Sequence, residues 1–149
     1  LLTTVDLLHG LPFGARWVVL AMMLAFLSDT AAYFAGRTFG KHKLYEKLSP
    51  KKTVEGSLGG LVGAIGGAFF ALYVMNLPIP VPHAIALGLV AGGLGQAGDL
   101  LESMLKRSAG VKDSGNILPG HGGLLDRVDA LMFTASTTWL YAVYVLDAR

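Results

Sequence analysis

Residues 57–77 read SLGGLVGAIGGAFFALYVMNL and contain no charged side chain. An α-helix needs about 20 mostly apolar residues to cross the hydrocarbon core of a bilayer. Pro78, Pro80 and Pro82 follow at once, and proline disrupts the interior of a helix. The stretch is therefore predicted to be a membrane-spanning helix that ends at a short proline-rich link.

Three further apolar stretches have a similar length. The chain has 149 residues, of which 53% are hydrophobic and 15% charged, whereas a soluble domain is about 25% charged. This composition excludes a disordered chain and argues against an ordinary water-soluble globule. The predicted fold is all-α, a polytopic transmembrane helix bundle, with residues 1–16 as a loop or interfacial segment and residues 17–149 as one membrane domain. Its spanning helices are expected at about 17–35, 57–77, 83–105 and 124–146.

The basic residues predict the orientation of this bundle. Ten of the 12 lysines and arginines lie in two links, between the first and second spans and between the third and fourth. Four alternating spans bring both links to the same side of the membrane. Loops rich in lysine and arginine remain in the cytoplasm, so this side is predicted to be cytoplasmic.

Glycines recur at four-residue spacing in two of the predicted spans. They are Gly59, Gly63 and Gly67 in the second span and Gly88 and Gly92 in the third. Small residues on one helical face allow two helix backbones to approach closely in lipid. The pattern predicts tight packing within the chain, or alternatively a subunit interface.

Several acidic residues occupy or border the apolar spans. Asp29 and Asp99 lie inside the first and third, and Asp126 and Asp129 stand at the start of the fourth. A carboxylate inside a span costs about 2.5–3.5 kcal/mol, so these groups must pair with basic side chains or share a cation. Carboxylates that share a hard divalent ion with phosphates are typical of Mg²⁺. Asp99 and Asp126 are therefore predicted to bind Mg²⁺, whereas Asp29 can alternatively form a hydrogen bond to a neighbouring helix.

The link before the fourth span combines basic residues with a Pro119-Gly-His-Gly-Gly123 turn. Glycine lets a backbone approach a ligand closely, and the following helix N-terminus attracts anions. The link is predicted to hold several phosphates, and the alternative is that its charges contact only lipid headgroups. Glu102, on the third span, is expected either to act beside the metal or to pair with Lys106 one helical turn later.

The other basic link contains Ser49-Pro50-Lys51-Lys52. Serine followed by proline is a typical helix start. Two lysines at that position oppose the helix dipole, which indicates an anion site instead. Both interpretations remain open from the sequence.

Three stretches together resemble the phosphatidate cytidylyltransferases, or CDP-diacylglycerol synthases. The first comprises Ser103–Arg107, Lys112–Gly115 and Pro119–Asp129. The others are Ser28–Tyr33 with Gly36-Arg37, and Ser49–Gly56. The chain resembles the C-terminal, catalytic half of that family.

This resemblance implies that CTP and phosphatidate give CDP-diacylglycerol and pyrophosphate, a step of phospholipid biosynthesis. It also implies dependence on Mg²⁺, with a monovalent cation such as K⁺ beside it, and a homodimer in the inner (plasma) membrane whose active site faces the cytoplasm. No nucleic-acid partner is expected. Asp129 joins Asp99 and Asp126 as a metal ligand in this comparison, and all three are expected to act in catalysis with Lys106 and Arg107. The residues expected to bind substrate are Lys51, Lys52, Ser103, Lys112, Asp113, His121, Gly122, Gly123 and Arg127.

Two alternatives are compatible with the same residues. One is a related CTP-dependent enzyme that acts on another lipid phosphate. The other is an ion or proton transporter that uses Asp29, Asp99 and Asp126 as a relay. A transporter needs polar groups that continue to the opposite face, where the proline-rich link carries no charge.

Overall fold

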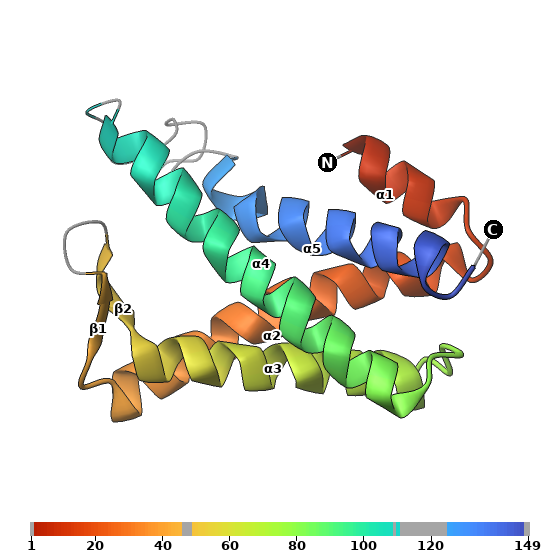
Figure 1. Ribbon diagram of the computed structural model, residues 1–149, viewed down its shortest axis with the longest axis horizontal. Helices are drawn as coiled ribbons and strands as arrows, with labels where there is room; N and C mark the ends of the chain where they lie inside the picture. Colours follow the sequence, from red (N-terminus) through yellow and green to blue (C-terminus); the bar gives the residue numbers. More distant parts are fainter. Residues whose placement is uncertain (1, 46–48, 109, 111–124, 148–149) are drawn as a thin grey trace.

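The computed structural model describes residues 2–45, 49–108, 110 and 125–147 of the chain. These residues form a bundle of helices with one small antiparallel hairpin (Figure 1). The predicted all-α fold is confirmed apart from that hairpin. The elements in order are α1 (Leu2–His9), α2 (Gly14–Phe39), β1 (Lys43–Tyr45), β2 (Ser49–Thr53), α3 (Val54–Tyr73), α4 (Val81–Ser108) and α5 (Leu125–Tyr144).

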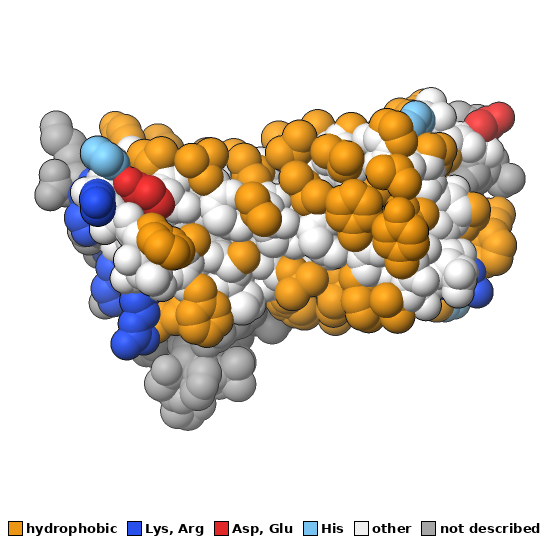
Figure 2. All heavy atoms as spheres, turned by 90° about the horizontal axis from the view of Figure 1, so that it is seen from below, with side chains coloured by type: hydrophobic (Ala, Val, Ile, Leu, Met, Phe, Trp, Pro, Cys, Tyr) orange, Lys and Arg blue, Asp and Glu red, His pale blue; other side chains and the backbone are white. Residues whose placement is uncertain are grey.

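The outer surface of the bundle is largely apolar. Figure 2 shows apolar side chains along the length of one face and basic side chains gathered at one end. Phe34 and Val62, for example, are 61% and 69% exposed. In the described part of the chain, α2, α3 and α4 are long and apolar enough to cross a membrane. An exposed apolar surface of this extent is compatible with contact with lipid. The chain is therefore a multi-pass membrane protein.

Glycine permits close packing between α2 and α3. A Cβ atom on Gly63 would lie 2.3 Å from the carbonyl oxygen of Leu27, and one on Gly59 would lie 2.3 Å from the Cβ of Ala35. The two backbones therefore touch along this face. Of the two uses predicted for these glycines, packing within the chain is confirmed.

Helix α4 packs against both α3 and α5. A Cβ on Gly92 would lie 2.6 Å from the Cβ of Ala64 on α3, whereas one on Gly98 would lie 2.1 Å from the ring of Phe133 on α5. In Figure 1, α4 crosses α3 and diverges from it toward the end that carries the hairpin. A wedge therefore opens between α3 and α4 at that end.

Two contacts define the register between α4 and α5. His83 Nδ1 lies 2.6 Å from Tyr141 Oη, and a Cβ on Gly95 would lie 3.7 Å from the carbonyl oxygen of Ala130. The residue number rises along α4 as it falls along α5, so the two helices run antiparallel. One further helical turn along α4 brings Asp99 toward the N-terminal part of α5.

Two local expectations need correction. Residues 1–16 were expected to form a loop or interfacial segment. Leu2–His9 is helical and Leu8 is fully buried, so this part is not a loop, and its interfacial position stays a prediction. The helix start at Ser49-Pro50 was one of two interpretations that the sequence left open. It is wrong, because Ser49–Thr53 pairs with β1 as a strand. Helix α3 begins only at Val54, where the Thr53 hydroxyl accepts a hydrogen bond of 3.1 Å from the Gly56 amide and caps the helix.

Candidate active site in the wedge between α2, α3 and α4

A cavity of about 450 Å³ lies in the wedge at the basic end of the bundle. Its walls come from α2, α3, α4 and the hairpin. The carboxylates of Asp29 on α2 and Asp99 on α4 both line it, as do the cationic side chains Arg37, Lys51 and Lys52. The volume is within the range typical of small-molecule sites, and the lining brings acids and bases to one place.

Lys52 and Asp99 form an ion pair across this cavity. The Lys52 ammonium group donates a hydrogen bond to Asp99 Oδ2, although the two residues are 47 positions apart in the chain. Their side chains are 27% and 35% exposed, so water screens the pair less than it screens a surface ion pair. The carboxylate that the sequence assigned to a metal therefore has a basic partner from the hairpin.

A polar pair fastens α4 to α3 one turn before Asp99. Gln96 Nε2 donates to the Ser57 carbonyl at 3.0 Å, and the Ser57 hydroxyl donates to Gln96 Oε1. Gly60 leaves the space for this amide, since a Cβ there would lie 2.5 Å from Gln96 Nε2. Sequence reasoning missed both residues. The available signal was an amide inside an apolar span, on the same helical face as Asp99.

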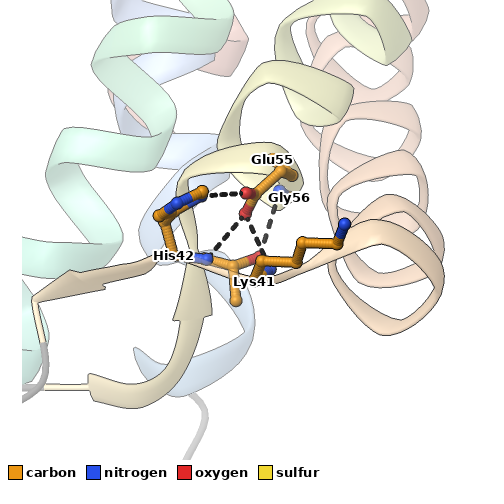
Figure 3. A network of polar contacts seen from close by, with 5 residues as sticks. Lys41, His42, Glu55 and Gly56 are labelled. Carbon is orange, nitrogen blue, oxygen red and sulfur yellow. Dashed lines mark hydrogen bonds and ion pairs between the residues drawn. The ribbon is translucent and has the colours of Figure 1, made fainter.

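The hairpin is anchored to the start of α3 through Glu55 (Figure 3). Glu55 Oε2 accepts hydrogen bonds from the backbone amides of Lys41 and His42, at 3.1 and 3.2 Å. Glu55 Oε1 lies 2.6 Å from His42 Nδ1, which must donate because an ionised carboxylate only accepts. These bonds fix the base of the hairpin, so Lys51 and Lys52 approach the cavity from a defined position.

Arg37 supplies a further positive charge to the cavity. Its Nη1 donates to Tyr33 Oη at 2.9 Å, and both residues line the cavity. Arg37 and Lys51 form no ion pair with any residue that the structure describes. Two cationic groups therefore remain available to an anionic ligand.

The last turns of α4 carry other predicted site residues, which do not line the cavity. These residues are Ser103, Lys106 and Arg107. Lys106 Nζ lies 3.3 Å from Glu102 Oε1. The pairing predicted for Glu102 with Lys106 is confirmed.

The remaining predicted residues belong to the link before α5 and to the first turns of that helix. Asp126, Arg127 and Asp129 lie in α5, and their side chains are outside the described part of the structure. Lys112, Asp113, His121, Gly122 and Gly123 lie outside the described residues altogether.

The carboxylates of the cavity are compatible with a hard cation. Among the described residues, no three acidic or histidine side chains are grouped so that they alone could hold a metal ion. However, Mg²⁺ in phosphate-handling sites is held by one or two carboxylates together with substrate phosphates and water. The carboxylate oxygens of Asp29 and Asp99 are donors of the type that such an ion takes, and the antiparallel register directs the N-terminal part of α5 toward Asp99.

Comparison with known proteins gives consistent matches. The family model described as Cytidylyltransferase family matches residues 1–145. Phosphatidate cytidylyltransferase of Bacillus subtilis (strain 168) is 47% identical over 121 residues, which are 81% of this chain and 45% of that protein. The proteins of the same name from Staphylococcus haemolyticus (strain JCSC1435) and Staphylococcus aureus (strain COL) are 43% and 45% identical over 120 residues, 80% of this chain and 46% of each relative. The chain thus spans about half the length of the curated relatives it matches.

Proposed function

Because the chain belongs to the cytidylyltransferase family, we propose that it transfers the cytidylyl group of CTP to phosphatidate, giving CDP-diacylglycerol and pyrophosphate. The observation that carries this proposal is the cavity in which Asp29 and Asp99 face Arg37, Lys51 and Lys52. Such a cavity suits two polyanions that must meet beside a cation.

The reaction needs no nucleophile from the protein. A phosphate oxygen of phosphatidate attacks the α-phosphorus of CTP, a new P–O bond forms, and the bond to pyrophosphate breaks. Two highly charged substrates repel each other, so positioning and charge neutralisation carry the catalysis. Arg37 and Lys51, exposed in the cavity, are suited to hold phosphate oxygens, and Tyr33 orients the Arg37 guanidinium.

The proposed cofactor is Mg²⁺, accompanied by a monovalent cation such as K⁺. Mg²⁺ would polarise the phosphoryl oxygens and align the two substrates. Asp99, Asp126 and Asp129 are the residues proposed to hold it. The antiparallel register of α4 and α5 supports this assignment, since it directs the N-terminal part of α5, which carries residues 126 and 129, toward Asp99.

The position of the cavity in the bundle fits a lipid substrate. It lies at the basic end, next to helices whose outer faces are apolar. Diacyl tails can therefore stay in the membrane while CTP enters from water. We propose that the cavity faces the cytoplasm on the charge pattern, and that the protein is a homodimer of the inner (plasma) membrane on the family resemblance.

The ion-transporter alternative is not favoured. A relay would require polar groups that continue from Asp29 and Asp99 through the bundle. The described core toward the other end contains buried apolar residues such as Leu20, Leu24 and Ala68.

Incorporation of radiolabelled CTP into phosphatidate micelles by the purified protein tests the function. Asp99→Asn should lower kcat at least about 100-fold, as expected when a group that stabilises transition-state charge is lost. Asp6→Asn is the matched control, because Asp6 is exposed on α1 and away from the cavity. Normal turnover by Asp99→Asn, or no incorporation by the unmodified protein, contradicts the proposal.

A further inference from the structure

Lys52 forms an ion pair with Asp99, the carboxylate to which the proposed function assigns a metal ion. Lys52 comes from β2 and Asp99 from α4. Each side chain keeps about a third of its surface exposed to the cavity, so a solute that enters can reach both groups.

An ammonium group and a divalent cation compete for the same carboxylate oxygen. Asp99 has a second oxygen, Oδ1, but the positive charge of the ammonium group within a few ångströms disfavours a second cation there as well. Linkage therefore requires the ammonium group and the divalent cation each to weaken the binding of the other.

We propose that Lys52 is an internal counterion, which neutralises Asp99 until a divalent cation binds there and is displaced by that cation. The inference rests on the proposed function, in which Asp99 holds the metal, and extends it by giving Lys52 a role before substrate binds. Without this partner, Asp99 would stand as an uncompensated charge on a helix that spans the membrane.

The displaced ammonium remains inside the cavity. The backbone of the hairpin is held by the Glu55 and Thr53 bonds, so the movement is confined to the flexible four-carbon side chain of lysine. Its charge then lies beside the metal at the place where substrate phosphates arrive. The exchange leaves the lysine free to contact a phosphate oxygen, which is the substrate-binding role that the sequence predicted for it.

Binding of Mn²⁺ alone, without nucleotide or lipid, measures the competition directly. Free Mn²⁺ is followed by electron paramagnetic resonance as the protein in detergent is titrated. Lys52→Met should bind Mn²⁺ about twofold to fivefold more tightly than the unmodified protein, which corresponds to the loss of one partly exposed ion pair. Lys52→Gln provides a second neutral variant, and Lys52→Arg should retain the affinity of the unmodified protein.

Lys51→Met is the control for net charge. It removes the same charge from the neighbouring position, but Lys51 is exposed and is not paired with Asp99. Its affinity for Mn²⁺ should change less than that of Lys52→Met. Equal or weaker binding by both neutral Lys52 variants overturns the counterion role, provided that Asp99→Asn still abolishes binding. Unchanged binding by Asp99→Asn instead overturns the metal site itself, so the two failures are distinguishable.

Discussion

Gln96 Nε2 donates a hydrogen bond of 3.0 Å to the backbone carbonyl of Ser57, and the Ser57 hydroxyl donates back to the Gln96 side chain. The pair joins α4 to α3 where the two helices begin to diverge. Asp99 lies one helical turn further along α4 and borders the cavity. Gln96 is therefore a positioning residue, which holds the rotation of α4 that presents Asp99 to Lys52.

Replacement of Gln96 by leucine should impair both stability and activity. The change leaves the partly buried polar atoms of Ser57 without their partner, at a cost of about 1–3 kcal/mol in the free energy of unfolding. It also frees the rotation of α4, so kcat should fall more than the apparent KM for CTP rises. Thermal unfolding in detergent and steady-state kinetics measure the two effects.

Gln96→Glu is the conservative comparison, because it keeps an oxygen that can accept from the Ser57 hydroxyl. It should recover part of the kcat that Gln96→Leu loses. If both variants keep normal kinetics, Gln96 does not position Asp99.

Gly63→Ala should destabilise the bundle. Its new Cβ would lie 2.3 Å from the Leu27 carbonyl oxygen and 2.6 Å from the Ala31 Cβ, so α2 and α3 must separate. Overpacking of this kind costs about 1–3 kcal/mol, to be measured as a lower midpoint of thermal unfolding in detergent.

Gly66→Ala is the matched control on the same helix. Nothing lies within 4 Å of a Cβ at Gly66, and alanine favours a helix over glycine by up to about 1 kcal/mol. This variant should be neutral or slightly stabilised. The same loss of stability in both variants would contradict the described packing of α2 against α3.

Arg37→Gln should weaken substrate binding. Its guanidinium lines the cavity and makes no ion pair with a described residue. Loss of one charge-assisted contact to phosphate costs about 1.5–3 kcal/mol, so the KM for CTP or for phosphatidate should rise at least about tenfold. Separate titration of the two substrates identifies which phosphate it holds.

Lys41→Met is the control for the loss of one positive charge near the cavity. The Lys41 side chain does not line the cavity, and only its backbone amide binds Glu55. Its KM values should stay close to those of the unmodified protein. A similar rise in both variants would assign the effect to net charge and not to Arg37.

Tyr33→Phe distinguishes the contact that Arg37 makes with substrate from the orientation of its guanidinium group by Tyr33. It removes the hydroxyl that accepts from Arg37 and leaves the charge in place. A smaller rise in the same KM is expected, because the guanidinium is then less well oriented.

The sequence predicts the helical bundle because hydropathy and span length are local properties. It also shows that Asp29 and Asp99 lie inside two apolar spans and need a partner there. Both residues line the same cavity. For Asp126 and Asp129 the convergence remains a prediction.

The hairpin and its contacts could not be predicted in the same way. Ser49-Pro50 carries a genuine local helix-start signal, and only pairing with β1 overrides it. The Lys52–Asp99 pair depends on where a strand meets a helix that is 47 residues away. The sequence shows Gln96 as an amide inside an apolar span. It does not identify the partner, because Ser57 lies on another span.

The crossing of α4 over α3 at Gly92 has a mechanical consequence. Beyond this point the helix continues for seven residues to Asp99, about 10 Å at 1.5 Å per residue, and leans on α5 through Gly98. The Gln96–Ser57 bonds lie between Gly92 and Asp99, so this stretch of α4 is braced by α3 on one side and by α5 on the other. The rigidity of the helix end that carries Asp99 therefore depends on side chains from both neighbouring helices.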